Sequence, residues 1–321
     1  DYTGFGSTIN PKFSFKFQPV DWALLRGSYN TGFRVPTFNQ IFNGTTATTS
    51  SSAAVVDPFK CPSLVVDNTP PIDPNCANIT PALLNGGNLN LGPEEAEQFS
   101  LGIVLRPAPR FSLSLDWWSI DVDGTITTLT VQQLLQNAST FPDRFIKDAA
   151  GDITAIDQRW INAGARKTQG IEVAFRGGFD ALSGSLDFGL DGTYLLKKKE
   201  KLTPTSPFGA SLINIFSLSG DLGLRWKHNA FISYSTDDVS VSLSQIYRSG
   251  YRNFVLPNFL NPRGNTRPDY NERVKPYMTY NFAVAYKGLA PNYEITFGIR
   301  NLFDKDPPFA ITYDTINGSG G

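Results

Sequence analysis

Hydrophobic and polar residues alternate strictly in several segments of the chain, and this pattern predicts β-strands. The clearest case is residues 12–18, where Phe13, Phe15 and Phe17 alternate with polar side chains. Successive side chains of a strand point to opposite faces, so each such segment has one apolar and one polar face. The same pattern predicts strands over residues 22–35, 98–106, 111–117, 171–176, 186–196, 222–235, 239–251, 276–287 and 293–303.

The ten predicted strands form five hairpins, and their connections alternate between short and long. Turns within hairpins are predicted at residues 19–21, 107–110, 179–183, 236–238 and 288–292. The links between hairpins are much longer; the first covers about 37–93, and the second, about 124–165, contains a predicted helix at 131–137. Compact soluble domains have connections of about 4–6 residues throughout, whereas outer-membrane barrels combine short periplasmic turns with long extracellular loops. We therefore predict that all turns lie on one rim and all long loops on the other.

Composition narrows the functional classes. Lysine and arginine total 28 against 29 acidic residues, so no basic field marks a nucleic-acid-binding protein. His228 is the only histidine, which disfavours histidine metal sites and a Ser-His-Asp triad. We expect no catalytic, cofactor or metal site, no enzyme activity and no nucleic-acid partner. No run of about 18 apolar residues occurs, so a membrane-spanning helix is not expected.

Aromatic residues support a strand that crosses a membrane. Trp226 and Tyr234 lie on one face of the same predicted strand. Their spacing is about 20 Å along the membrane normal, close to the separation of two aromatic girdles around an apolar band about 25 Å tall. His228 shares this face and is therefore expected to point toward lipid, where an imidazole is unusual.

The only two cysteines lie in a loop-like stretch rich in proline, asparagine and aspartate. Cys61 and Cys76 are separated by 15 residues, with no further cysteine or histidine nearby to complete a metal site. We therefore expect a Cys61–Cys76 disulfide, which indicates an oxidising compartment.

Four stretches of the sequence resemble the C-terminal part of TonB-dependent outer-membrane receptors. They are residues 10–42, 92–103, 162–175 and 293–309, and they include the runs Gly32-Phe33-Arg34-Val35-Pro36 and Asn301-Leu302-Phe303-Asp304-Lys305-Asp306-Pro307-Pro308. The resemblance implies a 22-stranded barrel, plugged by an N-terminal domain, in the bacterial outer membrane. It also implies uptake of a scarce nutrient such as a siderophore, cobalamin, saccharide or peptide. The partners implied are the energy-coupling TonB complex, acting through the plug domain, and outer-membrane lipid with lipopolysaccharide.

The fold expected is therefore all-β. Residues 1–321 are interpreted as a partial receptor barrel of about ten antiparallel strands, an open half of a 22-stranded barrel, without the plug domain and final strand. A sheet of ten strands cannot close at the diameter of its parent barrel. We expect an open, curved sheet with edges near Lys12–Gln18 and Tyr293–Phe303, and no transport by this segment alone.

Polar-face side chains are the candidate contacts with a ligand or the lumen. They are Arg26, Glu172, Arg248, Tyr251 and Arg300. The run Lys197-Lys198-Lys199-Glu200-Lys201 suits lipopolysaccharide phosphates, although a solvated loop base is the simpler explanation. Two other functions stay open: a passive porin-like barrel, and a soluble all-β adhesion or carbohydrate-binding protein.

Overall fold

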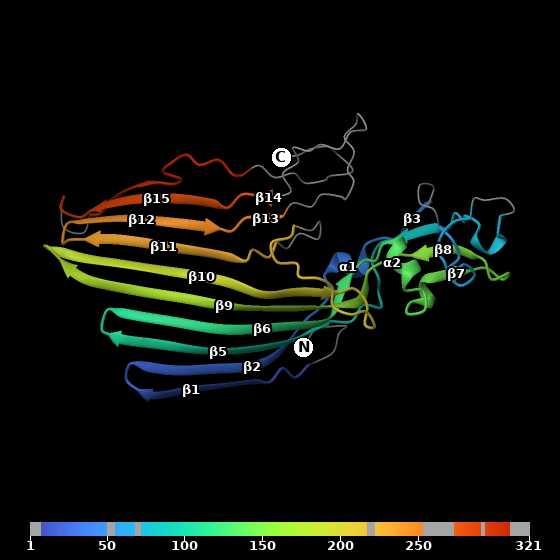
Figure 1. The fold of residues 1–321 in the computed structure, drawn as a ribbon, viewed down its shortest axis with the longest axis horizontal. Coiled ribbons are helices and arrows are strands. Elements are labelled where there is room, and N and C mark those ends of the chain that lie inside the picture. The colour runs from blue at the N-terminus through green and yellow to red at the C-terminus, as the bar shows by residue number, and fades with distance from the viewer. Residues whose placement is uncertain are drawn as a thin grey trace.

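Ten strands form one antiparallel sheet in the computed structural model, which describes residues 8–49, 55–67, 72–216, 222–252, 273–289 and 293–308. Their order follows the chain, so each strand pairs with its predecessor and its successor in the sheet (Figure 1). The strands are β1 (Lys12–Val20), β2 (Ala23–Arg34), β5 (Glu94–Ala108), β6 (Phe111–Thr127), β9 (Ile161–Ala181), β10 (Gly184–Lys201), β11 (Trp226–Ser235), β12 (Val239–Arg248), β15 (Tyr277–Tyr286) and β16 (Ile295–Ile299).

The short turns gather at one end of the sheet. The β1–β2, β5–β6, β9–β10 and β11–β12 turns all lie at the left end in Figure 1, and the long connections leave from the opposite end. The predicted arrangement of turns and loops is confirmed for these four hairpins. The β15–β16 connection includes residues 290–292, which are outside the described residues.

The sheet is open. Strands β1 and β16 form its two edges, and in the described part of the chain they do not pair with each other. This confirms the expected open sheet. The helices of the described ranges are all too short or too polar to span a bilayer.

The last strand is shorter than the alternation predicts. β16 ends at Ile299, and Asn301 and Asp304 both adopt the left-handed backbone region, with φ of 53° and 46°. The side chain of Asn301 accepts a hydrogen bond from the amide of Lys305 at 2.9 Å. The prediction of a strand over 300–303 was therefore wrong, because the Asn301–Pro308 run forms a turn after β16.

Two long connections fold together into a small separate unit, called here the loop domain (Figure 1). It combines the β2–β5 and β6–β9 connections in a four-stranded sheet of order β3-β4-β8-β7, in which β4 and β8 pair in parallel. Its elements are α1 (Phe38–Phe42), β3 (Thr46–Thr49), the 3₁₀ turn η1 (Pro74–Cys76), β4 (Ala82–Asn85), α2 (Val131–Gln136), the 3₁₀ turn η2 (Pro142–Arg144), β7 (Phe145–Lys147) and β8 (Ile153–Asp157).

The buried hydrophobic core lies mainly in the loop domain. Its members share near-complete burial: Val55, Leu129, Leu134, Leu135, Ala138, Phe141, Phe145, Ile153, Ile156 and Ala163. Helix α2, predicted from sequence, supplies two of these leucines and begins with a capping box between Thr130 and Gln133. The first connection, expected only as a long link over about 37–93, thus contributes strands and a short helix to a folded unit.

The large sheet instead exposes its apolar face. Phe13, Phe15 and Phe17 of β1 are 53–67 % exposed, and Leu101 of β5 is 47 % exposed. A soluble sheet would cover such a face, whereas a membrane barrel presents it to lipid. The remaining short pair, β13 (Tyr251–Arg252) and β14 (Arg273–Val274), lies at the long-loop end of the sheet (Figure 1).

His228 lies on this apolar face, as the alternation predicts, and its ring is fully hydrogen-bonded. Trp226 Nε1 donates to His228 Nδ1 at 2.8 Å, and His228 Nε2 lies 2.9 Å from Gln245 Oε1. Tyr247 stacks on the imidazole, with ring centroids 5.1 Å apart. Because both ring nitrogens have partners, an imidazole can face an apolar environment here without an unsatisfied polar group.

Candidate functional site

A row of polar and charged side chains crosses the inner, polar face of the sheet. The pairing register aligns neighbours along this row: Arg26 faces Gly102, which faces Asp116; then Glu172, Thr193, Lys227 and Arg248 follow on successive strands. Residues directly opposite in a ladder share one face of the sheet. A concavity of about 470 Å³ lies along this row. We call these residues the lumen row.

The first part of the row is neutralised by an ion pair. Arg26 on β2 donates two hydrogen bonds to the carboxylate of Asp116 on β6, at 2.7 and 2.8 Å. The pair reaches across β5 at Gly102, where a Cβ atom would collide with the Asp116 carboxylate. Glycine at this position therefore lets two non-adjacent strands be joined by a bidentate contact.

The rest of the row keeps unpaired charges. Among the described residues, Glu172, Lys227 and Arg248 form no ion pair. Hence one anion and two cations on the polar face have no partner of opposite charge among the described residues. No group of three metal-ligating side chains occurs in the described ranges.

The expected contact residues separate into two sets. Arg26, Glu172 and Arg248 lie at the same level of the sheet, on different strands of the lumen row. Tyr251 is instead in β13 beside Phe216, with ring centroids 6.5 Å apart, and Arg300 is exposed directly after the edge strand β16. Sequence reasoning did not select Asp116 and Lys227, although their alternation with apolar neighbours in β6 and β11 would have placed them on the polar face.

A second ionic contact joins neighbouring strands of the sheet at the end where the loop domain begins. Arg34 Nη2 donates to Glu94 Oε1 at 2.6 Å and Arg34 Nε to Glu94 Oε2 at 2.7 Å. The buried Glu94 also accepts the backbone amide of Ile126 at 2.7 Å. One carboxylate thus joins β2, β5 and β6 at the ends from which the long loops leave.

The Glu94 contact should make this junction sensitive to acid. Burial by itself raises the pKa of Glu94, but hydrogen bonds from Arg34 and from the Ile126 amide outweigh it and lower the pKa below its ordinary value of 4.5. The stabilisation is therefore fully present above pH 4.5 and is lost as the pH falls through the lowered pKa. We expect the Glu94→Gln variant to be less stable than wild type at neutral pH.

The difference between the two proteins should shrink as the pH falls from neutral through the lowered pKa of Glu94, because the wild-type carboxyl group then becomes neutral as well. Thermal unfolding of both proteins across that pH range measures this directly. A constant difference at every pH would contradict the ionic role of Glu94.

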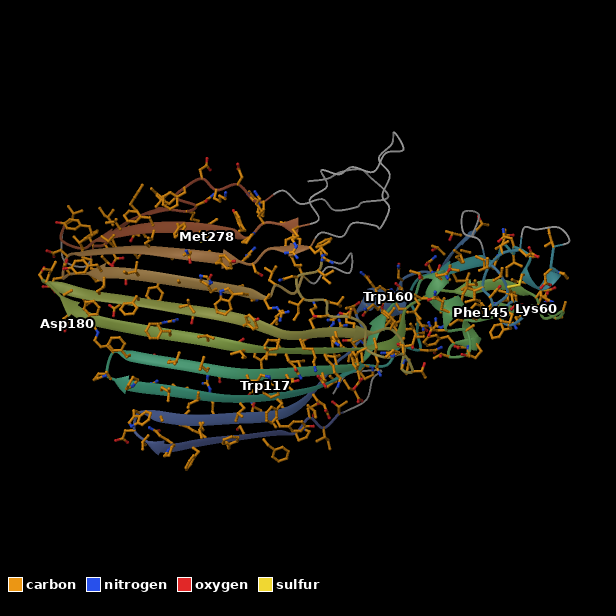
Figure 2. All side chains as sticks on the ribbon, viewed as in Figure 1. Lys60, Trp117, Phe145, Trp160, Asp180 and Met278 are labelled. Carbon is orange, nitrogen blue, oxygen red and sulfur yellow. A yellow bond between two sulfur atoms is a disulfide. The ribbon has the colours of Figure 1, made fainter. Side chains whose placement is uncertain are left out.

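The disulfide expected from the sequence is present. Cys61 and Cys76 are bonded, with their Cα atoms 5.0 Å apart. Figure 2 shows the bond near Lys60 at the end of the loop domain farthest from the large sheet, while Phe145 lies closer to that sheet. The cross-link therefore stabilises the most remote part of the loop domain.

Comparison with known proteins places these features in a family. The family model "TonB dependent receptor-like, beta-barrel" matches residues 1–302. A search of curated proteins finds no match. Similar solved structures include the siderophore receptor PirA from Acinetobacter baumannii, with 20 % identity and a TM-score of 0.60, covering 94 % of this chain and 38 % of that one.

Two further proteins show the same fold. A mutant of the ferric enterobactin receptor PfeA from Pseudomonas aeruginosa has 16 % identity and a TM-score of 0.59, covering 94 % of this chain and 36 % of that chain. The iron transporter FrpB from Neisseria meningitidis has 12 % identity and a TM-score of 0.52, with coverage of 94 % and 36 %. The chain thus spans little more than a third of these receptors' length. The open antiparallel sheet and its exposed apolar face agree with the family match over residues 1–302. The chain therefore belongs to the β-barrels of TonB-dependent receptors, which are proteins of the bacterial outer membrane.

Proposed function

We propose that the complete receptor imports a ferric siderophore in a TonB-dependent manner. The observation that carries the proposal is the loop domain: two long connections share one hydrophobic core beyond the ends of the strands. A passive pore needs an open mouth, whereas a receptor needs ordered loops that can capture a ligand. The siderophore class is supported by PfeA and PirA, whose names describe receptors for ferric enterobactin and for siderophores.

The lumen row supplies the contacts in this proposal. Arg26 is already neutralised by Asp116, so Lys227 and Arg248 are the cations left for an anionic ligand or for the plug domain. Glu172 would favour a positively charged group of the ligand or of the plug domain on its side of the row. Tyr251 and Arg300, away from the row, are proposed as contacts only at the mouth and at the sheet edge. The energy-coupling complex would act through the plug domain, which the family implies.

Uptake of iron-55 tests the proposal. Cells that lack their own siderophore receptors would express the complete gene product and receive labelled ferric catecholate or hydroxamate siderophores. We expect accumulation that stops when the TonB complex is deleted. Uptake that persists without this complex would favour the porin-like alternative. Accumulation of cobalamin, a saccharide or a peptide in place of iron would support a TonB-dependent receptor but contradict the siderophore as its nutrient.

A variant of the lumen row connects uptake to the structure. We expect Lys227→Gln/Arg248→Gln to reduce siderophore uptake by about fivefold or more, since it removes two solvent-accessible charges from the ligand path. The matched control is Lys287→Gln, which removes one exposed cation at the turn end, next to Glu294. Equal uptake by both variants at equal surface expression would remove the lumen row from the mechanism.

A further inference from the structure

A group of lysines faces outward directly beyond the apolar band. The register pairs Lys199 of β10 with Lys167 of β9, Lys167 with Asp121 of β6, and Asp121 with Glu97 of β5. In β6, Asp121 lies an even number of residues from Trp117, with no bulge between them, so both share the lipid-facing side. Lys167 and Lys199 therefore point outward as well. Lys197 and Lys201 lie on the same side. The four residues Lys167, Lys197, Lys199 and Lys201 are called here the lysine ladder.

A β-bulge decides which charges belong to the ladder. The pairing register of β10 with β9 shifts between Leu195 and Lys197. Without the shift, Tyr194 on the lipid side would be followed there by Lys198 and Glu200. The extra residue instead turns Lys198 and Glu200 inward, where Lys198 is buried and Glu200 binds Arg166 at 2.9 Å. Bulges that re-aim side chains in this way are typical of functional positions in sheets.

The ladder carries an excess of positive charge. Lys167 and Lys199 are directly opposite, which is unfavourable for two like charges. Lys167 is offset by Asp121 at 2.9 Å, but Lys197 and Lys199 have no acidic partner among the described residues. The ring of Phe208 lies 5.3 Å from Lys167 Nζ and 5.8 Å from Lys201 Nζ, so it holds two of the ammonium groups on the outer surface.

The ladder stands at the height of a lipid headgroup. Trp117, Tyr194 and Trp226 form an outward aromatic row that marks the upper limit of the apolar band, as girdles do. At about 6.6 Å for each two residues and a tilt of about 40°, Lys197 and Lys199 lie about 5 and about 10 Å above that row. Arg225 lies over the ring of Tyr194, 5.5 Å from its centre, and adds a further cation at this boundary.

We propose that the lysine ladder binds the phosphate groups of a phosphorylated glycolipid of the outer leaflet, with its acyl chains on the aromatic row below. Lysine binds phosphate as a point charge, so several lysines on one outward surface suit a headgroup that carries more than one phosphate group. The acidic residue Glu97 on β5 repels the same phosphates, so it directs the headgroup toward β9 and β10. The site is independent of the nutrient that the receptor carries.

The test is a binding titration of the purified complete receptor in detergent with diphosphorylated lipid A. Two lysines, each worth roughly fivefold, predict that Lys197→Gln/Lys199→Gln binds about twenty-five-fold more weakly than wild type. Lys197→Arg/Lys199→Arg keeps both charges and should bind like wild type. The matched control Lys16→Gln/Lys287→Gln removes two cations from the lumen face and the turn end, and should leave the affinity unchanged.

Two further ligands decide the chemistry. Removing the phosphates from lipid A should weaken its binding to wild type as much as the two glutamine substitutions weaken binding of diphosphorylated lipid A. Phosphatidylglycerol should bind wild type more weakly than diphosphorylated lipid A does. Equal affinity of wild type and the glutamine variant would overturn the proposal, as would equal binding of the dephosphorylated lipid. Equal binding of phosphatidylglycerol would also overturn it, in favour of an ordinary anionic phospholipid.

Discussion

Replacing Ile156 by alanine should lower the free energy of unfolding of the loop domain by about 2–5 kcal/mol. Ile156 has no solvent exposure, and it lies in β8 between Leu83 of β4 and Phe145 of β7. Truncation would leave a cavity where the strands of both long connections meet. The large sheet, which has separate contacts, should keep its stability.

Hydrogen exchange resolved by segment measures this effect. We expect faster exchange in the loop domain of Ile156→Ala and unchanged exchange in β9 and β10. The matched control is Ile146→Ala, because Ile146 belongs to the same small sheet but is 41 % exposed. Comparable losses in the two variants would contradict a core centred on Ile156.

Removing the disulfide should have the next largest effect. The double variant Cys61→Ser/Cys76→Ser opens a cross-link over a separation of 15 residues. In the chain-entropy account, closing a loop of that length is worth about 3 kcal/mol, mainly through the unfolded state. The loss should be confined to the loop domain, since both cysteines lie at its outer end.

Protease sensitivity near residues 55–67 and 72–85 provides the measurement. Cleavage of the double variant should be faster than that of the oxidised wild type, and adding reductant should bring the wild type to the same rate. Reductant should not change the variant. If the double variant resisted cleavage as well as the oxidised wild type, the cross-link would not stabilise this region.

The large sheet could be predicted from sequence because a membrane strand repeats a simple rule. Residues such as Phe13 and Leu113 alternate with polar neighbours over long segments, so strand existence, face and hairpin order all follow. The same rule placed Arg26, Glu172 and Arg248 on the polar face. It did not show that Asp116 reaches Arg26 across Gly102, because that contact depends on the register of three strands.

The loop domain was not predictable from the same rule. Its strands β4 and β8 have only four and five residues, too few to establish a period, and they pair in parallel between two distant connections. The orientation of the lysine ladder was equally hidden, since it depends on the bulge at Leu196. Only the capped helix α2 and the disulfide had local signals strong enough to be recognised.

The parallel pair of β4 and β8 has a consequence for receptor engineering. Each strand comes from a different connection, and β5 and β6 intervene between them in the chain. A chimera that received only one connection from a relative would have to pair a strand of the relative with a strand of this protein. A poor match would leave buried backbone N–H and C=O groups without hydrogen bonds. Exchange of ligand preference between such receptors should therefore succeed when both connections are transplanted as one unit, and fail when either is moved alone.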